Sequence, residues 1–386
     1  MLYSVLTGIV LGVSAGTMTG LLPGVHTNLV AVLFGASMTG VVDAVAAAVF
    51  LLSMGVTHTV TSILPNVYLG VCEGADVVNV LPSHRLVGEG RGGDAVLANV
   101  FGGVVAATLS ALYFGAATWL VDISYQRVLY VLPVILFVAL AYLVFRAPSW
   151  VEGVVVVGLS GVLGWTVLSS ALENALFPLL SGLFGIPLLL FGDGDAVVRD
   201  RCNEGVALRC GRAGVIGSCF GFATSFLPGV GSGVASSVGV KAVSNDPTVY
   251  LSMTGAVDTA DFYLSLATLL VVDKARNGIV VVLSNVLESV FIPLLVVVGV
   301  VSAGLAAVIT LRLEPVMPKV FEVVSYEWLS RLVTGLIVGL VAALSGVRGV
   351  CVLGVSTLLG SMVHWRGVPK IVMMSCIIVP VTVFLT

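Results

Sequence analysis

Residues 16–28 read GTMTGLLPGVHTN, and the motif returns in the second half as GFATSFLPGVGSG at residues 221–233. Both copies carry a Leu-Pro-Gly-Val core inside an apolar run. Proline ends an incoming helix because it has no N–H to donate and clashes with the preceding turn. The glycine that follows it permits positive φ and a close approach of other groups. The sequence therefore predicts two matched helix breaks.

The composition around these breaks is that of a membrane protein. Hydrophobic residues make up 58% of the 386 residues and charged residues only 10%, against about 25% in soluble domains. The apolar runs are continuous, which excludes a β-barrel and predicts an all-α polytopic protein of the cell membrane with about ten to twelve membrane segments. The net charge of −3 offers no basic surface, so we expect the lipid bilayer but no nucleic acid as a partner.

Two further matches accompany the breaks. Leu52-Ser53-Met54 recurs as Leu251-Ser252-Met253, and with one inserted residue this alignment places His58 opposite Asp258. Residues 96–100 resemble residues 282–286. Three matches in one order predict a duplication whose halves are inverted across the membrane. We expect a first repeat with its following spans in 1–191, a charged connecting loop in 192–212, a second repeat in 213–311 and C-terminal membrane segments in 312–386.

The connecting loop also predicts an orientation. It carries four arginines between residues 199 and 212. Lysine and arginine in short loops favour the cytoplasmic side, and nearby acids do not cancel this preference. We therefore expect residues 199–212 in the cytoplasm.

The helix breaks themselves predict a binding site. Unpaired backbone groups at membrane depth survive only beside a cavity or packed protein. The N-terminus of the helix after a break offers N–H donors and a partial positive charge to an anion. We expect the substrate site to comprise Pro23, Gly24, His26, Thr27, Asn28, His58, Thr59, Ser62, Asn66, Pro228, Gly229, Gly231, Ser232 and Gly233.

Two acids lie in an apolar segment, residues 248–272, which we interpret as another interrupted helix. A charge at the bilayer centre costs roughly 2.5–3.5 kcal/mol and marks ion pathways. Asp258 and Asp261 are three residues apart and share a helix face. Together with Thr259 and carbonyls at a break, they are the expected site of a coupling Na⁺ or proton. The open alternative places both acids in a hydrated loop, and packing alone would also explain His26 and His58.

The repeated motif resembles a family signature. Residues 16–24 and 221–229 are similar to the G-x-x-x-G-x-[LI]-P-G stretch in each half of the large permease subunit of the tripartite tricarboxylate transporters, the TctA family, with Ser225 replacing one glycine. Residues 60–66 and 88–93 resemble two further family stretches, and the Pro-Gly-Val-His-x-Asn form is similar to a divergent archaeal branch. The resemblance implies an extracytoplasmic binding protein and a small membrane subunit as partners.

The sequence thus predicts an ion-coupled secondary transporter of a small organic anion of the carboxylate class, working by alternating access. It predicts no catalytic residues, no cofactor and no metal site, since the cysteines and histidines lack metal-site spacing. A flippase for polyprenyl phosphate or another lipid anion stays open, although 15–35 and 222–240 contain no arginine to hold a phosphate. An intramembrane enzyme, a non-transporting assembly subunit and a homo-oligomer are further open readings.

Overall fold

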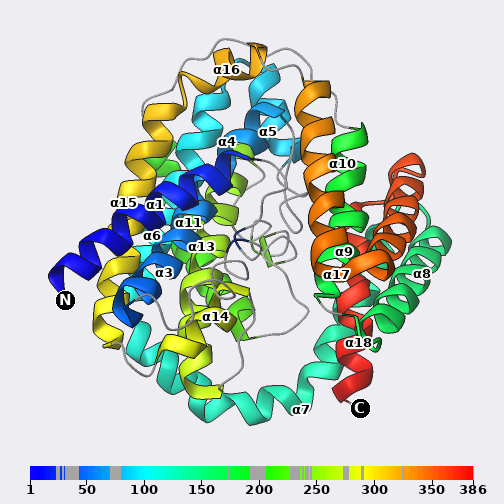
Figure 1. Ribbon diagram of the computed structural model, residues 1–386, viewed down its shortest axis with the longest axis horizontal. Helices are drawn as coiled ribbons and strands as arrows, with labels where there is room; N and C mark the ends of the chain where they lie inside the picture. Colours follow the sequence, from blue (N-terminus) through cyan, green and yellow to red (C-terminus); the bar gives the residue numbers. More distant parts are fainter. Residues whose placement is uncertain are drawn as a thin grey trace.

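The computed structural model describes residues 1–22, 27, 30, 43–69, 80–172, 174–191, 206–226, 235–236, 239, 243, 246–272, 278–287, 291–323 and 326–385. All regular elements of this part of the chain are helices (Figure 1). They are α1 Leu2–Leu21, α3 Ala44–Thr61, α4 Ile63–Leu69, α5 Val80–Gly88, α6 Gly92–Leu112, α7 Phe114–Arg146, α8 Trp150–Leu168, α9 Leu176–Leu180, η2 Ser181–Gly185, α10 Ile186–Phe191, α11 Val206–Phe226, α13 Pro247–Val272, α14 Gly278–Leu287, α15 Ile292–Leu313, α16 Met317–Val323, α17 Tyr326–Trp365, η4 Lys370–Met374 and α18 Ser375–Leu385.

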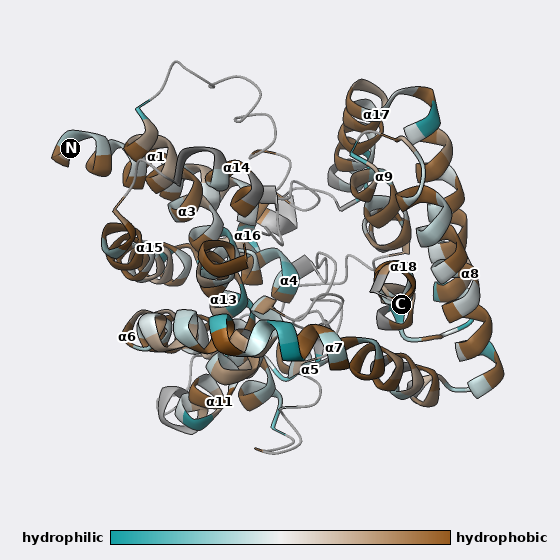
Figure 2. Cartoon of the chain, turned by 90° about the horizontal axis from the view of Figure 1, so that it is seen from below, coloured by the Kyte–Doolittle hydropathy of each residue, from teal (hydrophilic) through white to brown (hydrophobic). Residues whose placement is uncertain are grey.

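The membrane character predicted from composition is confirmed. Eight helices among the described residues are long and apolar enough to cross a membrane, and two shorter apolar helices, Leu176–Phe191 and Val372–Phe384, accompany them. Peripheral helices such as α8, α15 and α17 are predominantly hydrophobic in Figure 2. The chain is therefore an all-α, multi-pass membrane protein.

The helices gather into two bundles (Figure 1). We call α1, α3–α6, α11 and α13–α15 the large bundle, and α8–α10, α17 and α18 the small bundle. The long helix α7 runs from one bundle to the other, with Pro133 inside it. Three of the apolar core clusters divide in the same way, since two consist of residues of the large bundle, α7 and α16, and one unites the small bundle and η4 with the second half of α7.

In the large bundle, α1 and α3 form a parallel pair. Glycine recurs at every fourth position of α1 from residue 8 to residue 20. A Cβ on Gly12 would lie 2.5 Å from the carbonyl oxygen of Phe50, and one on Gly16 would lie 2.5 Å from that of Met54. Only glycine permits this backbone contact, in the manner of small residues between membrane helices. Because the contacts advance along both helices together, α1 and α3 run in the same direction.

The second half repeats this pair with α11 and α13. A Cβ on Gly217 would lie 2.8 Å from the carbonyl oxygen of Met253, and one on Gly221 would lie 2.6 Å from that of Val257. The glycines of the repeated motif therefore serve the same purpose in each half: they seat the first helix on the backbone of a second, parallel helix.

The first helix of each pair ends just before its proline. Helix α1 ends at Leu21, and Leu22 is extended with φ −96° and ψ 103°, the conformation that a residue before proline prefers. Helix α11 ends at Phe226, likewise two residues before its proline, Pro228. The two helix ends thus stand at matching places, as the repeated motif predicts.

A parallel pair requires the chain to return between its two helices. The Ser4 hydroxyl holds the pKa of the Asp43 carboxyl below its usual value, so the start of α3 lies beside the start of α1. The chain between residues 22 and 43 therefore leads from one end of α1 back to the other. Apart from Thr27 and Val30, residues 23–42 lie outside the described part of the chain.

The two halves are inverted with respect to one another. Gly55 of α3 packs against the ring of Phe262 in α13. Further along α3, Val60 lies near Gly103 of α6. Thr259 also lies near Gly103, and it precedes Phe262 in α13. The residue numbers of these contacts rise along α3 while they fall along α13, so the two helices are antiparallel. The predicted inversion of the repeats is confirmed.

One further helix of each half packs against the second helix of the parallel pair in the other half. Gly102 of α6 lies in direct contact with the backbone of Ser252 in α13. Ser302 of α15 donates a hydrogen bond of 2.9 Å to Ser53 of α3. Since α6 and α15 each follow a short helix and make this exchanged contact, they are counterparts. The predicted match of 96–100 with 282–286 is therefore wrong, because it pairs the middle of α6 with α14.

The same exchange continues in the small bundle. Ser160 of α8 hydrogen-bonds Ser375 at 2.6 Å, and Ser356 of α17 packs against Gly182 in η2. The sequences agree, with GVVVVGLSGVLG at 153–164 and GVCVLGVSTLLG at 349–360. These paired contacts extend the duplication into residues 312–386, which the sequence analysis left outside the second repeat.

Helix α17 is two antiparallel helices joined at Gly346, whose φ of 61° and ψ of −162° break the helical path. Both of its ends lie at α10. Ser330 donates a hydrogen bond to the Leu189 carbonyl at 2.7 Å, and the ring of His364 stacks on Phe191 at 4.7 Å. The hinge lies where a residue with positive φ is needed, which favours glycine.

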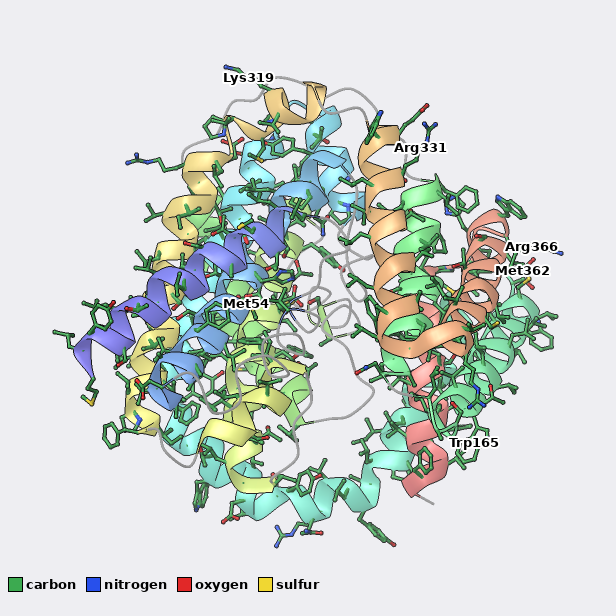
Figure 3. The ribbon with its side chains drawn as sticks, viewed as in Figure 1. Met54, Trp165, Lys319, Arg331, Met362 and Arg366 are labelled. Atoms are coloured by element: carbon green, nitrogen blue, oxygen red, sulfur yellow. The ribbon has the colours of Figure 1, made fainter. Side chains whose placement is uncertain are left out.

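One end of the molecule is rich in basic residues. The starts of α6, α11 and α13 lie there together with α4 and the end of α15, which the hydrogen bond of 2.5 Å from Tyr68 Oη to Glu314 Oε1 joins. Lys319 and Arg331 project from this end in Figure 3. Arg91 also lies there, paired at 2.8 Å with the fully buried Asp94, which raises the pKa of the arginine. The positive-inside preference favours the cytoplasm for this end, in line with the expectation for residues 199–212.

Packing of α1 on α3 makes a first prediction. Gly16→Leu should lower the free energy of unfolding by about 1–3 kcal/mol, the usual cost of overpacking, because the new side chain meets the backbone of Met54. Gly304→Leu is the matched control, since nothing lies within 4 Å of a Cβ at that position of α15. Thermal unfolding in detergent, followed by size-exclusion chromatography, measures the difference. Equal melting of both variants would contradict the packing described.

The orientation makes a second prediction. In a variant with all six cysteines replaced by serine, Lys319→Cys should react with a membrane-impermeant maleimide only after the cells are opened. A cysteine introduced at Tyr3, at the opposite end of the large bundle, should react in intact cells. The reverse pattern would place the basic end outside.

Candidate functional site

The signature of the first half holds a buried histidine. His58 of α3 is 7% exposed, and its Nδ1 lies 3.1 Å from Thr19 Oγ1 of α1. The Thr19 hydroxyl also donates to the carbonyl of Gly16 at 3.1 Å. The contact between His58 and Thr19 joins α1 to α3 and orients the His58 ring, and the tautomer of the ring decides which of the two groups donates.

A second hydroxyl reinforces this arrangement. Thr61 Oγ1 lies 2.9 Å from the Thr57 carbonyl and 3.3 Å from the Gly16 carbonyl, so one hydrogen is shared between the two acceptors. Thr61 itself is fully buried against Gly20. The end of α1 is thus held to α3 by polar contacts as well as by close packing.

The second half builds the equivalent structure without a histidine. Thr224 Oγ1 donates to the Gly221 carbonyl at 2.9 Å, just as Thr19 does to Gly16. Ser225 is fully buried, and its carbonyl accepts a hydrogen bond of 3.2 Å from Thr268. Both helix ends are therefore anchored by hydroxyl groups inside the bundle.

The packing of the helices identifies a different counterpart of His58 in the second half. Gly16 contacts Met54 and Thr57, whereas Gly221 contacts Val257, Ala260 and the backbone nitrogen of Asp261. Thr57 in the first half therefore corresponds to Ala260 in the second. The residues that follow them are His58 and Asp261. The expected correspondence of His58 with Asp258 is therefore wrong, because that alignment is three residues out of the packing register.

Asp258 and Asp261 belong to an unbroken helix. Helix α13 is continuous from Pro247 to Val272, which corrects the interpretation of 248–272 as an interrupted segment. The acids are half-buried, and Thr259 between them is 1% exposed. Within α13 itself, no break frees a carbonyl near them. Because α3 and α13 are antiparallel, with Gly55 at Phe262 and Val60 near Thr259, the acids lie level with His58.

The other predicted residues fall into two groups. Thr27 and Asn66 are each 3% exposed, and Thr59 and Ser62 are half-buried. Thr59 donates to the Val56 carbonyl at 2.8 Å, a bond within its own helix. The remaining predicted positions lie outside the described residues: Pro23, Gly24, His26, Asn28, Pro228, Gly229, Gly231, Ser232 and Gly233.

Some buried polar atoms of α3, α4 and α13 have no hydrogen-bond partner among the described residues. They include Thr57 Oγ1, Asn66 Oδ1 and Thr259 Oγ1. An unsatisfied buried polar group costs about 1–3 kcal/mol, so a functional reason for such groups is worth testing. No group of three or more histidine, cysteine or acidic side chains among the described residues is placed to hold a metal ion.

Sequence reasoning missed Thr19 and Thr224 as site residues. Both were visible in the repeated motif, where each stands three residues after the first glycine. The proline and glycine at the break are the more conspicuous signal in the same motif. Their role depends on the neighbouring parallel helix, which a single sequence does not display.

Comparisons with known proteins agree with this architecture. The model of a protein family described as "Tripartite tricarboxylate transporter TctA family" matches residues 6–375 of the chain. An uncharacterized protein of Methanocaldococcus jannaschii is 27% identical over 333 residues, covering 83% of each chain. No solved structure matches the chain with significance. With a match over nearly its whole length, the chain belongs to the TctA family of tripartite tricarboxylate transporter permeases.

Proposed function

We propose that this permease is an ion-coupled secondary transporter of a small organic anion of the carboxylate class. The observation that carries the proposal is the inverted pair of helices, α1 and α11, that each end two residues before a proline beside a parallel helix. Inverted repeats with helices that stop inside the membrane are typical of transporters whose site lies at the repeat interface. Alternating access then follows from movement of one part of the protein against the other.

The first half supplies the anion side of this site. His58 is buried, and its Nδ1 lies 3.1 Å from Thr19 Oγ1. A histidine ring nitrogen that carries a hydrogen can donate to a carboxylate. Thr27, His26, Asn28 and the backbone after Pro23 complete the proposed contacts with the anion, through hydroxyl, amide and N–H donors.

The second half supplies the cation side. Asp261 stands where the first half has His58, and Asp258 and Thr259 lie on the same helix. The two carboxylates and the Thr259 hydroxyl are hard oxygen donors, suited to Na⁺ or to a proton, and the hydroxyl oxygen has no hydrogen-bond partner among the described residues. A cation bound there would also neutralise the charge that repels a carboxylate substrate. This gives a physical reason for coupling the two fluxes.

The family carries a further expectation about partners. As the large subunit of a tripartite system, the permease would receive its substrate from an extracytoplasmic binding protein and pair with a small membrane subunit. We propose both partners for this chain. Co-purification with each candidate subunit, encoded nearby or supplied in trans, is the direct check.

Uptake by proteoliposomes tests the proposed function. Labelled mono-, di- and tricarboxylates should be compared under Na⁺ and pH gradients, with cationic solutes as a control. At least one carboxylate should accumulate, and only when an ion gradient is present. Transport of cationic solutes alone would contradict the anion site, and movement of a lipid phosphate alone would favour the flippase.

Variants of the paired positions make the third prediction. Asp261→Asn and Asp258→Asn should reduce ion-driven uptake by about tenfold or more and flatten its dependence on the ion, because each removes a charged ligand. Glu327→Gln is the matched control, since that carboxylate is exposed and paired only with Arg331 on the same helix turn. Full ion dependence in both aspartate variants would remove them from coupling.

The histidine makes the fourth prediction. His58→Gln should raise the KM for the anion, whereas Thr19→Val should raise it more weakly by releasing the ring. Both variants keep the volume of the buried group, so folding should be retained. Initial rates of uptake over a range of anion concentrations measure the effect. An unchanged KM in His58→Gln would exclude the histidine from the site.

A further inference from the structure

The small bundle contains a groove that the transport site does not use. It lies between the end of α8 and the start of the second half of α17, with a cavity of about 360 Å³. Most of its lining is apolar, including Leu163, Val352 and Val355. Arg348 is the one charged residue in the lining, and Ser170 lies opposite it on the other wall. The groove therefore joins an apolar channel to a single positive charge.

That charge has no counterpart within the described residues. No ion pair or hydrogen bond joins Arg348 to another described side chain, although Arg85, Arg91, Arg331 and Arg366 all pair with carboxylates. Arg348 follows the hinge at Gly346 and is exposed. An arginine in a membrane bundle costs several kcal/mol unless it finds a partner or reaches the interface.

The duplication shows what is missing at this place. In the alignment of 153–164 with 349–360, Arg348 corresponds to Glu152, and Ser170 corresponds to Arg366. Glu152 and Arg366 face each other at the opposite end of the same helices, with Arg366 Nη1 3.4 Å from Glu152 Oε1. One copy therefore closes its end with an internal ion pair. The other copy replaces both members, the glutamate with Arg348 and the arginine with Ser170, and leaves a cavity beside Arg348.

We propose that the groove holds one anionic phospholipid, whose phosphate takes the place of the missing carboxylate. Arginine binds phosphate through paired, charge-assisted hydrogen bonds, and the Ser170 hydroxyl can donate a further one. The acyl chain lies along Leu163, Val352 and Val355, of which Val355 is 53% exposed. Basic pockets between membrane helices bind acidic headgroups by this chemistry, and the apolar walls favour a lipid over a free anion.

Native mass spectrometry of the purified permease tests the proposal. Protein from nanodiscs of dioleoyl phosphatidylglycerol should retain one lipid, and protein from dioleoyl phosphatidylcholine should retain about tenfold less, because the choline cation makes the second headgroup net neutral and repels Arg348. Arg348→Gln should abolish the difference between the two lipids. Arg127→Gln is the matched control, since Arg127 is also an exposed arginine but does not line the groove.

A second variant and a chemical probe keep the test independent of folding. Ser170→Glu should displace the lipid while Arg348 stays in place, because the new carboxylate restores the internal pair seen at Glu152. Cys351 lines the groove and is exposed, so in a variant with the other five cysteines changed to serine it reports occupancy by its maleimide reaction rate. Phosphatidylglycerol should slow that reaction several-fold in the parent and not in Ser170→Glu.

Three results would overturn the proposal. Equal retention of phosphatidylcholine and phosphatidylglycerol would make the groove a general apolar surface. Equal protection of Cys351 by inorganic phosphate in lipid-free micelles would make it a free-anion site. Full lipid retention in Arg348→Gln, with the thermal unfolding of the parent, would show that the arginine takes no part.

Discussion

Contact between the backbones of α1 and α3, repeated between α11 and α13, is the constraint on which the large bundle depends. Glycines at Gly12 and Gly16, and at Gly217 and Gly221, bring carbonyl oxygens of the neighbouring helix to within van der Waals distance. Because lipid tails are as apolar as the helix surfaces, the hydrophobic effect does not drive helices together inside a membrane. Such close packing is therefore a principal source of cohesion. The parallel direction of each pair then forces the chain to return between its helices.

This constraint also positions the polar groups. A helix that ends against a parallel partner leaves its last turn inside the protein, where Thr19 and Thr224 bond to the carbonyls of Gly16 and Gly221. Inversion of the halves brings the two sets to one level of the bundle. The halves differ there in chemistry, with His58 in one and Asp261 in the other, and this asymmetry is what a coupled site for an anion and a cation requires.

Departures from the repeat are as informative as the repeat itself. Ser225 stands in place of Gly20 without disturbing the pair, because its side chain bonds back to the Phe222 carbonyl. Arg348 and Ser170 stand in place of the Glu152–Arg366 pair and leave a groove. A duplicated fold supplies its own comparison, so a position that lost its partner in one copy can be recognised without other sequences.

The sequence alone was sufficient for much of the fold. The low charge content predicted a membrane protein, and the two Leu-Pro-Gly-Val motifs predicted matched helix ends, because the effect of proline on the preceding turn is local. It failed where the answer depended on contacts between distant helices. Val96-Leu97-Ala98 in α6 was matched to α14, and α13 was read as interrupted, because apolar residues repeat by chance and a polar side chain in a helix can be satisfied by a neighbour.

Covalent geometry and the local cost of desolvation thus determined from sequence that the chain spans a membrane, is duplicated and has helices that end two residues before Pro23 and Pro228. Only the tertiary structure decided that Asp261 rather than Asp258 is the counterpart of His58, and that the duplication includes the small bundle. The direction and register of two packed helices are set by the shapes of both surfaces. Neither surface is visible in the sequence of one helix alone.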